Sequence, residues 1–383
     1  MSELLQLYKK TRSQSTALCE PLEIEDYIPQ PVDFASPPKW HLSHSTWFFE
    51  EMILKKFVTN YKVFNPHFGF LFNSYYQTLG DRAIRTERGT ITRPTVAEVV
   101  DYRKYVDQHI ENLLLNNDDP ELRELIILGI NHEQQHQELL ITDLKHTFSY
   151  NPIHPVYKEG FNLTSQQNEE SGWLKVEEGI YDIGYDGKEF HFDNEKGQHK
   201  VFLHPFEISK ALVTNGEYIE FMEAGGYENF KVWLDEAWTW VTENQVKSPL
   251  YWKKIEDQWF SYTLEGLKPI EPNDQLTHIS FYEAQAFATW KGLRLPTEFE
   301  WEAACDQFKW GKRWEWTYSA YLPYPQFKIA EGAVGEYNGK FMISQMVLRG
   351  ASTATAKGHE RKTYRNFFQP KHRWQVTGIR LAK

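Results

Sequence analysis

Residues 132–138, which read His132-Glu133-Gln134-Gln135-His136-Gln137-Glu138, decide the fold of the first part of this chain. Successive residues of a helix are rotated by about 100°, so His132 and His136 lie about 40° apart on one face. The spacing also satisfies the H-E-x-x-H pattern of zinc metalloproteases, in which the glutamate, here Glu133, is the general base. By the same geometry, Glu133 and Glu138 project away from the histidine face. The stretch therefore predicts a helix that carries half of a metal site.

The first 150 residues show helical periodicity with short breaks, which predicts a bundle of four helices. Two of these helices begin at clear capping signals. Thr95 with Glu98 forms a capping box, and Asp119 is followed by Pro120 at the first helical position. A bundle core can host a metal site built from facing helices. The four helices are expected near residues 3–19, near 40–54, from residue 95 onward and over 119–148.

The remainder of the chain predicts a mixture of helices and strands, so the expected fold class is α+β. Residues 179–184 have the pattern of a strand, and a helix is expected over 214–224. Further helices are expected to begin at Ser280 and at Thr297, because each of these residues has a glutamate three positions on. The expected domains are a helical domain over 1–150, a polar linker over 151–175 and a mixed domain over 176–383.

Composition and charge exclude several classes of protein. The 383 residues carry a formal net charge of −11, whereas nucleic-acid and anionic-membrane binders normally carry an excess of Lys and Arg. No segment approaches the roughly 18 apolar residues that span a bilayer, and residues 1–15 lack the apolar core of a signal peptide. The two cysteines, Cys19 and Cys305, fit a reducing compartment. We expect a cytoplasmic protein without nucleic-acid or membrane partners.

Two histidines on an apolar helix face predict a metal site, with histidines satisfied inside a core as the alternative. Periodicity alone does not choose the third ligand. His41 and His44 lie on the second expected helix, whereas His146 lies about 280° round the helix from His136 and therefore off the face. A site of three histidines would leave positions open for substrate and oxygen. Imidazole binds zinc and iron alike, so the ligand type does not select the metal.

Several motifs together resemble one enzyme family. Trp40–Glu50 and His132–Glu138 resemble the DinB-like iron domain of the ergothioneine-forming sulfoxide synthases, commonly called EgtB. The second half is similar to a formylglycine-generating-enzyme, or sulfatase-modifying, domain with its C-type-lectin-like fold. The segments that carry this second likeness are Val213–Tyr218, Arg294–Trp301, Trp314–Thr317 and Gly378–Leu381. The likeness covers nearly the whole chain and implies a DinB-like four-helix bundle followed by a lectin-like mixed domain.

The resemblance implies a nonheme Fe(II) enzyme that uses oxygen. The family's iron ligands fall on His44, His132 and His136, and its contacts with a trimethylated histidine substrate fall on Gln135 and Asn366. The implied reaction joins the sulfur of cysteine to imidazole C2 of N-α-trimethylhistidine (hercynine) and leaves a sulfoxide. The resemblance therefore implies small-molecule substrates and a site to which both domains contribute.

The family resemblance also points to residues for proton delivery and for the sulfur donor. Tyr75 and Tyr76 look like the paired tyrosines of cysteine-using members, with a packed aromatic step as the alternative. Phe368 also favours free cysteine, because members that use γ-glutamylcysteine carry an acidic residue at this position. Arg85 and Arg88 are candidates to hold a substrate carboxylate by paired hydrogen bonds, with solvated surface arginines as the alternative.

The trimethylammonium group of hercynine cannot donate hydrogen bonds, so aromatic faces are expected around it. Trp314, Trp316 and Phe367 are candidate walls, and Tyr324 and Tyr321 are weaker tyrosine candidates of the second domain. A synthase that uses γ-glutamylcysteine or a selenium donor remains an alternative, as do a zinc hydrolase and a non-catalytic lectin-like module. Formylglycine generation is less favoured, because that chemistry uses a cysteine pair and the second domain offers one cysteine.

Overall fold

The computed structural model describes residues 3–74, 81–168, 170–329 and 338–383. The chain divides into two compact units. The first unit holds the described residues up to Lys158 together with Thr355–His359, and the second holds the described residues of Glu159–Ala330, Asn338–Ala354 and Glu360–Lys383. The border after Lys158 falls inside the stretch 151–175 that has linker composition. The domain limits expected from the sequence stay a prediction.

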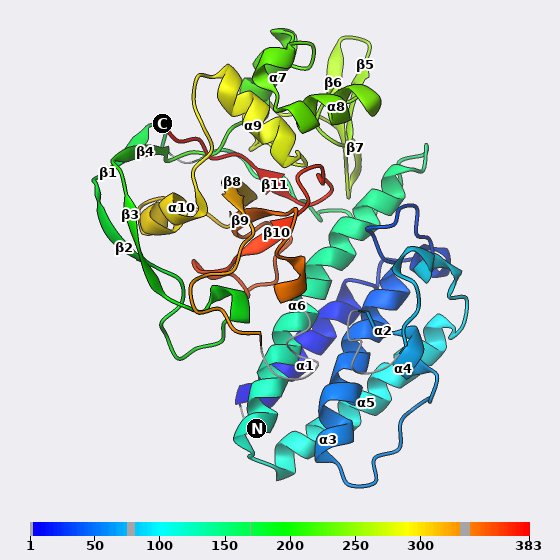
Figure 1. The fold of residues 1–383 in the computed structure, drawn as a ribbon. Coiled ribbons are helices and arrows are strands. Elements are labelled where there is room, and N and C mark those ends of the chain that lie inside the picture. Colours follow the sequence, from blue (N-terminus) through cyan, green and yellow to red (C-terminus); the bar gives the residue numbers. More distant parts are fainter. Residues whose placement is uncertain (1–2, 75–80, 169, 330–337) are drawn as a thin grey trace. The chain divides into compact units, whose positions relative to one another are not determined.

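The first unit is helical, and Figure 1 shows its long helices in blue, cyan and green. Four of its described helices exceed ten residues, which confirms the predicted bundle: α1 (Glu3–Ala17), α2 (Pro38–Phe49), α5 (Val96–Asn116) and α6 (Pro120–Ser149). α2 continues as one π-helical turn, Glu50–Leu54, and then as the short helix α3 (Lys55–Phe57). A further short helix is α4 (Phe68–Leu71). All residues of α2 are buried, and this helix packs against both α5 and α6.

Capping side chains fix the starts of α5 and α6. The Thr95 hydroxyl accepts the Glu98 backbone N–H at 3.2 Å, and the Glu98 carboxylate accepts the Thr95 N–H at 2.7 Å. The Asp119 carboxylate accepts the N–H groups of Glu121 and Leu122 at 2.8 and 3.3 Å. These bonds satisfy donors that have no partner inside their own helix. Both predicted helix starts are confirmed.

The close approach of α6 to α2 depends on Gly129. A Cβ atom at this position would lie 2.5 Å from Cε1 of Phe49 and 3.1 Å from Cε1 of Phe48. The ring of Phe48 packs in turn against the ring of His132, with 4.8 Å between the centroids. The missing side chain at position 129 therefore lets α2 pack beside the histidine face of α6. The surrounding apolar core includes Trp47, Tyr102, Val106, Ile110, Leu122, Ile126 and Ile130.

The second unit contains a four-stranded sheet in the order β10-β9-β8-β11 (Figure 1). β8 (Trp314–Ala320) and β9 (Met346–Gly350) are antiparallel. β10 (Asn366–Phe368) pairs antiparallel with β9, and β11 (Thr377–Gly378) pairs parallel with β8. Smaller antiparallel sheets pair β1 (Trp173–Val176) with β4 (Phe206–Ser209), β2 (Gly179–Ile183) with β3 (His199–Leu203), and β6 (Gln258–Thr263) with β5 (Trp252–Ile255) and β7 (Gly266–Pro269).

Helices accompany these sheets, so the predicted α+β class is confirmed. The described α-helices of the second unit are α7 (Asn215–Glu223), α8 (Asp235–Glu243), α9 (Phe281–Trp290) and α10 (Glu298–Ala304). Three of them begin at a capping box, whose cap residues are Thr214, Ser280 and Thr297. Across the described residues of the whole chain, no helix combines the length and the apolar character that crossing a membrane requires.

We expect Gly129→Ala to lower the free energy of unfolding by about 1–2 kcal/mol. Overpacking an interior costs ~1–3 kcal/mol, and the higher helix propensity of alanine returns up to ~1 kcal/mol. Urea unfolding of the metal-free protein measures the change. Gly69→Ala is the matched control, because its Cβ would meet Glu51 Oε1 at an ordinary 3.6 Å. A Gly129→Ala variant as stable as the parent protein would contradict the close packing of α2 on α6.

Candidate metal centre

Three histidines from two helices converge inside the first unit. His44 comes from α2, and His132 and His136 come from one face of α6. Their ligand nitrogens lie within 4.8 Å of one another, and no other such group of possible metal ligands occurs among the described residues. The ring centroids are 4.7–5.0 Å apart. The structure thus brings together the three residues that the resemblance assigns to iron.

The imidazole of His44 is held in a fixed orientation. Its Nδ1 lies 2.6 Å from the carbonyl oxygen of Phe72, which can only accept, so Nδ1 carries the proton. Nε2 of the neutral ring therefore keeps its lone pair for a metal. The rings of Trp40 and Trp47 stack on the imidazole at 4.4 and 5.4 Å, each at 14°. Both the tautomer and the plane of His44 are set before any metal binds.

The imidazole of His136 is supported by side chains instead. Its Nδ1 lies 2.9 Å from Nδ1 of His41, and Nε2 of His41 lies 3.1 Å from Oδ2 of Asp143. The sequence leaves His41 and His44 as alternative third ligands, and the structure places His44 in the triad and His41 next to His136. Asp143 was missed in the sequence. Its position seven residues after His136, on the same helix face, is the signal that would have found it.

The three imidazoles are neutral at physiological pH. Burial lowers the pKa of His132 to about 4. Burial, and then the neighbouring imidazoles, lower the pKa of His44 and of His136 well below the ordinary 6.5. The buried Nδ1 of His132 has no hydrogen-bond partner in the part of the chain that the structure describes. Neutral imidazoles are the form that binds metal, and a buried nitrogen without a partner fits a ligand position, so the residues fit a divalent metal such as iron or zinc.

Glu133 points into a different environment. Its carboxylate accepts from Arg12 Nη1 at 2.8 Å, Arg103 Nη2 at 3.0 Å and Ser15 Oγ at 2.6 Å. Burial by itself raises the pKa of this carboxylate, but the two guanidinium groups outweigh that effect and lower the pKa to about 2. Both oxygens of Glu133 are therefore committed to a buried ion network. This arrangement does not suit the general base that a zinc hydrolase of the H-E-x-x-H type needs.

The other candidates of the first unit have different surroundings. Arg88 is buried, its guanidinium lies 3.4 Å from the centroid of Trp40, and it donates to Ser36 Oγ and Ser74 Oγ at 2.8 Å. It thus touches the tryptophan that stacks on His44. Arg85 is exposed and donates to a backbone carbonyl at 2.9 Å. Gln135 is partly buried on α6. Tyr75 and Tyr76 lie outside the described residues.

Four candidates of the second unit fall into two pairs by their surroundings. Asn366 and Phe367 are half-buried on β10, where Phe367 stacks on Tyr321 at 4.1 Å and 9°. Trp314 and Tyr324 are in the interior, with exposed fractions of 1% and 4%. Trp314 packs against Tyr364, and the Tyr324 hydroxyl donates to Glu298 at 3.0 Å. Trp314 and Tyr324 are thus held by contacts within the unit. The role of these two residues in substrate binding stays a prediction.

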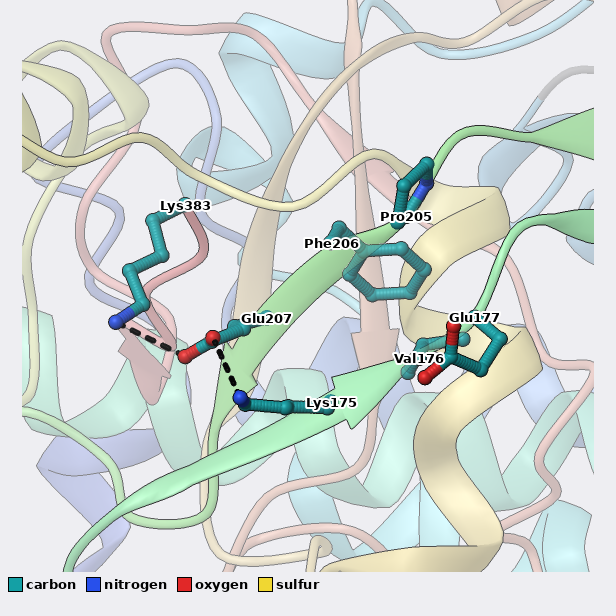
Figure 2. Close-up of a pocket in the computed structure, with 7 residues that line it drawn as sticks. All are labelled: Lys175, Val176, Glu177, Pro205, Phe206, Glu207 and Lys383. Atoms are coloured by element: carbon teal, nitrogen blue, oxygen red, sulfur yellow. Dashed lines mark ion pairs between the residues drawn. The ribbon is translucent and has the colours of Figure 1, made fainter.

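A surface depression lies beside β1 and β4 and the C-terminal residue (Figure 2). Three of its charged side chains pair with one another, because Glu207 lies 2.9 Å from Lys383 Nζ and 3.9 Å from Lys175 Nζ. The remaining lining residues are Val176, Glu177, Pro205 and Phe206. None of the residues predicted for catalysis or substrate binding lines this depression, and we assign it no function.

Comparison with known proteins identifies both units. Residues 7–140 match the DinB superfamily, and residues 160–313 match the sulfatase-modifying factor enzyme 1-like domain. The hercynine oxygenase of Mycolicibacterium smegmatis is 29% identical over 321 residues, 70% of this chain and 73% of that protein. The hercynine oxygenase of Mycolicibacterium thermoresistibile is 29% identical over 251 residues, 50% of this chain and 54% of that protein. The formylglycine-generating enzyme of Thermomonospora curvata is 30% identical over 177 residues, 38% of this chain and 54% of that protein.

The two matches define a class of two-domain proteins, in which a DinB helical unit precedes a sulfatase-modifying-factor-like unit. Together they cover most of this chain. Both domains occur here in that order, and the relative that matches 70% of this chain is a hercynine oxygenase. The two domain matches and the hercynine oxygenase relatives together support membership of the EgtB family.

We expect Glu133→Gln to lower the free energy of unfolding by about 3–5 kcal/mol at neutral pH, because it leaves Arg12 and Arg103 buried without their counter-charge. Folding lowers the pKa of Glu133 from 4.5 to about 2, so its contribution to stability is complete above pH 4.5 and is lost as the pH falls toward 2. Urea unfolding between pH 2 and 7 measures both effects.

The control for this experiment is Glu124→Gln, the same change at an exposed site of α6, where little effect is expected. A stable Glu133→Gln variant that has lost a zinc-dependent hydrolase activity would contradict the structural role of Glu133.

Proposed function

We propose that this protein is a nonheme Fe(II), oxygen-dependent sulfoxide synthase. It joins the sulfur of cysteine to imidazole C2 of hercynine and yields hercynylcysteine sulfoxide. The observation that carries the proposal is the convergence of His44, His132 and His136 in a chain whose relatives include hercynine oxygenases. In the balanced reaction the thiol and the C2 position each lose one hydrogen. One atom of O2 goes to the sulfoxide, and the other leaves with these hydrogens as water.

Iron suits the donor set and the reaction. Three neutral imidazoles leave coordination positions open for substrates, as in other nonheme iron sites. Bound iron would supply the electron transfer to oxygen that amino-acid side chains lack. Zinc also binds imidazole, but zinc has no redox chemistry, and the hydrolytic alternative lacks a free general base because Glu133 is held by Arg12 and Arg103.

The protein's own groups have separate tasks in this proposal. The carbonyl of Phe72 and the stacked rings of Trp40 and Trp47 orient His44. These indoles also make the surroundings of the ligand apolar, which strengthens electrostatic interactions with bound substrates. Gln135 and Asn366 are the proposed hercynine contacts. Holding both substrates at one centre turns an encounter of separate molecules into a reaction between positioned groups.

Formylglycine generation, suggested by the second family match, is less well supported. That chemistry uses a pair of cysteines, and the described residues of the second unit contain one, Cys305. Burial raises the pKa of Cys305 to about 12, so the thiolate that reacts with metals and disulfides does not form at neutral pH. Cys305 is therefore a core residue rather than a nucleophile.

The decisive experiment is anaerobic reconstitution with Fe(II), followed by oxygen, hercynine, and cysteine in competition with γ-glutamylcysteine. Mass spectrometry should detect hercynylcysteine sulfoxide, with the cysteine adduct in excess. We expect His44→Ala, His132→Ala and His136→Ala to abolish both stoichiometric iron binding and product formation, because each removes one of three ligands. His109→Ala, on α5 and bonded to the Tyr105 carbonyl, is the matched control and should keep both. Full activity in the triad variants would contradict the proposal.

Tyr75→Phe and Tyr76→Phe test proton delivery. We expect one of these variants to lower the rate of sulfoxide formation by about 10²–10⁴-fold, the usual contribution of a positioned acid or base. Iron binding should be unchanged, because no imidazole is removed. Anaerobic iron titration and product analysis separate the two effects, with Tyr150→Phe at an exposed site as the control. Equal rates in all three variants would exclude both tyrosines as the donor.

A further inference from the structure

Asp143, His41 and His136 form a continuous hydrogen-bonded chain that ends at the metal centre. Oδ2 of Asp143 lies 3.1 Å from Nε2 of His41, and Nδ1 of His41 lies 2.9 Å from Nδ1 of His136. Asp143 and His41 are 2% and 3% exposed, so water does not compete for these bonds. The ring centroids of His41 and His136 are 5.2 Å apart. The fourth ring nitrogen of the two histidines, Nε2 of His136, remains for a metal.

The chemistry of the atoms decides where the protons lie. A carboxylate oxygen can only accept, so Nε2 of His41 carries a proton that it donates to Asp143. Only one proton can lie between the two Nδ1 atoms, and a metal on Nε2 of His136 would leave that proton on Nδ1 of His136, which then donates to Nδ1 of His41. His136 then has its single proton on Nδ1. Its Nε2 is then the bare nitrogen that a metal needs.

The same two helices that supply the ligands also supply the chain. His41 precedes His44 by one turn of α2, and Asp143 follows His136 by two turns of α6. Asp143 is itself fixed, because its Oδ2 also accepts the backbone N–H of Ser36 at 2.8 Å, just before α2 begins. Any shift of α2 along α6 would therefore break these hydrogen bonds and at the same time displace His44.

We propose that His41 and Asp143 are positioning residues, which hold His136 in the tautomer and orientation that present Nε2 to the metal. The proposal rests on the metal centre of the proposed function and extends it beyond the three ligands. The two ligands His44 and His136 are therefore oriented in different ways. His44 is oriented by the backbone carbonyl of Phe72, which substitution does not remove, whereas His136 depends on two side chains. Support of this kind raises the basicity of a ligand and fixes its geometry.

The test measures metal binding at one fixed pH, with Fe(II) for affinity and Co(II) for both affinity and its visible absorption bands. We expect Asp143→Ala and His41→Phe to weaken the binding of both metals by about 10–100-fold, the usual effect of losing such a partner. The Co(II) bands should shift, because His136 no longer has one orientation. Asp143→Asn keeps an acceptor oxygen of the same size and should restore most of the affinity and the original bands.

The control for a general loss of stability is Asp107→Ala on α5. Asp107 accepts from Tyr8 and from Arg12, both at 2.6 Å, and neither partner belongs to the hydrogen-bonded series Asp143–His41–His136. Its loss should destabilise the bundle while leaving the Co(II) bands unchanged. If Asp143→Ala does not fold, His41→Phe, which keeps a ring of similar size, supports the same conclusion.

The outcomes separate this inference from the proposed function. If the parent protein binds neither metal, or binds them independently of His44, His132 and His136, the proposed function fails. If the parent binds metal and both Asp143→Ala and His41→Phe keep its affinity and bands, the positioning role fails and the metal centre stands. If His41→Phe abolishes binding while Asp143→Ala has no effect, His41 is a ligand, and the positioning role is again overturned.

Discussion

The close packing of α2 on α6 is the constraint on which the rest of the first unit depends. Gly129 permits it, because any Cβ there would overlap the ring of Phe49. The contact brings His44 within reach of His132 and His136, which a single helix could not do, since one helix face presents only two of the three ligands. It also leaves α2 without a solvent-exposed face, so even its polar residues must find partners inside the bundle.

The two faces of α6 solve the problem of buried polar groups in opposite ways. On one face Glu133 keeps its charge, because Arg12 and Arg103 neutralise it. On the other face His132 and His136 give up theirs, because desolvation disfavours an imidazolium among other imidazoles. Uncharged imidazole nitrogens are the form that binds a metal, and metal binding would stabilise the fold by mass action. Fold stability and metal affinity are therefore linked through the same residues.

In the second unit, buried arginines and carboxylates pair with one another and stabilise the fold. Glu315 accepts from Arg380 at 2.6 and 2.9 Å and from Trp301 at 2.6 Å, and Glu298 accepts from Arg365 at 2.8 and 3.0 Å. Bidentate arginine–carboxylate pairs of this kind hold the strands and loops of this unit in place. No metal-ligand cluster is found among the residues described for this unit, so the oxygen chemistry is proposed for the helical unit.

Local rules of sequence were enough for the α+β class, the helix starts at Thr95, Asp119, Ser280 and Thr297, and the placement of His132 and His136 on one face. These features depend on neighbours a few residues apart, which the sequence displays directly. The choice between His41 and His44, the partners of Glu133 and the support of His136 by Asp143 were decided only by the tertiary structure. Each involves groups from different helices, and their distance is set by how closely side chains allow those helices to pack.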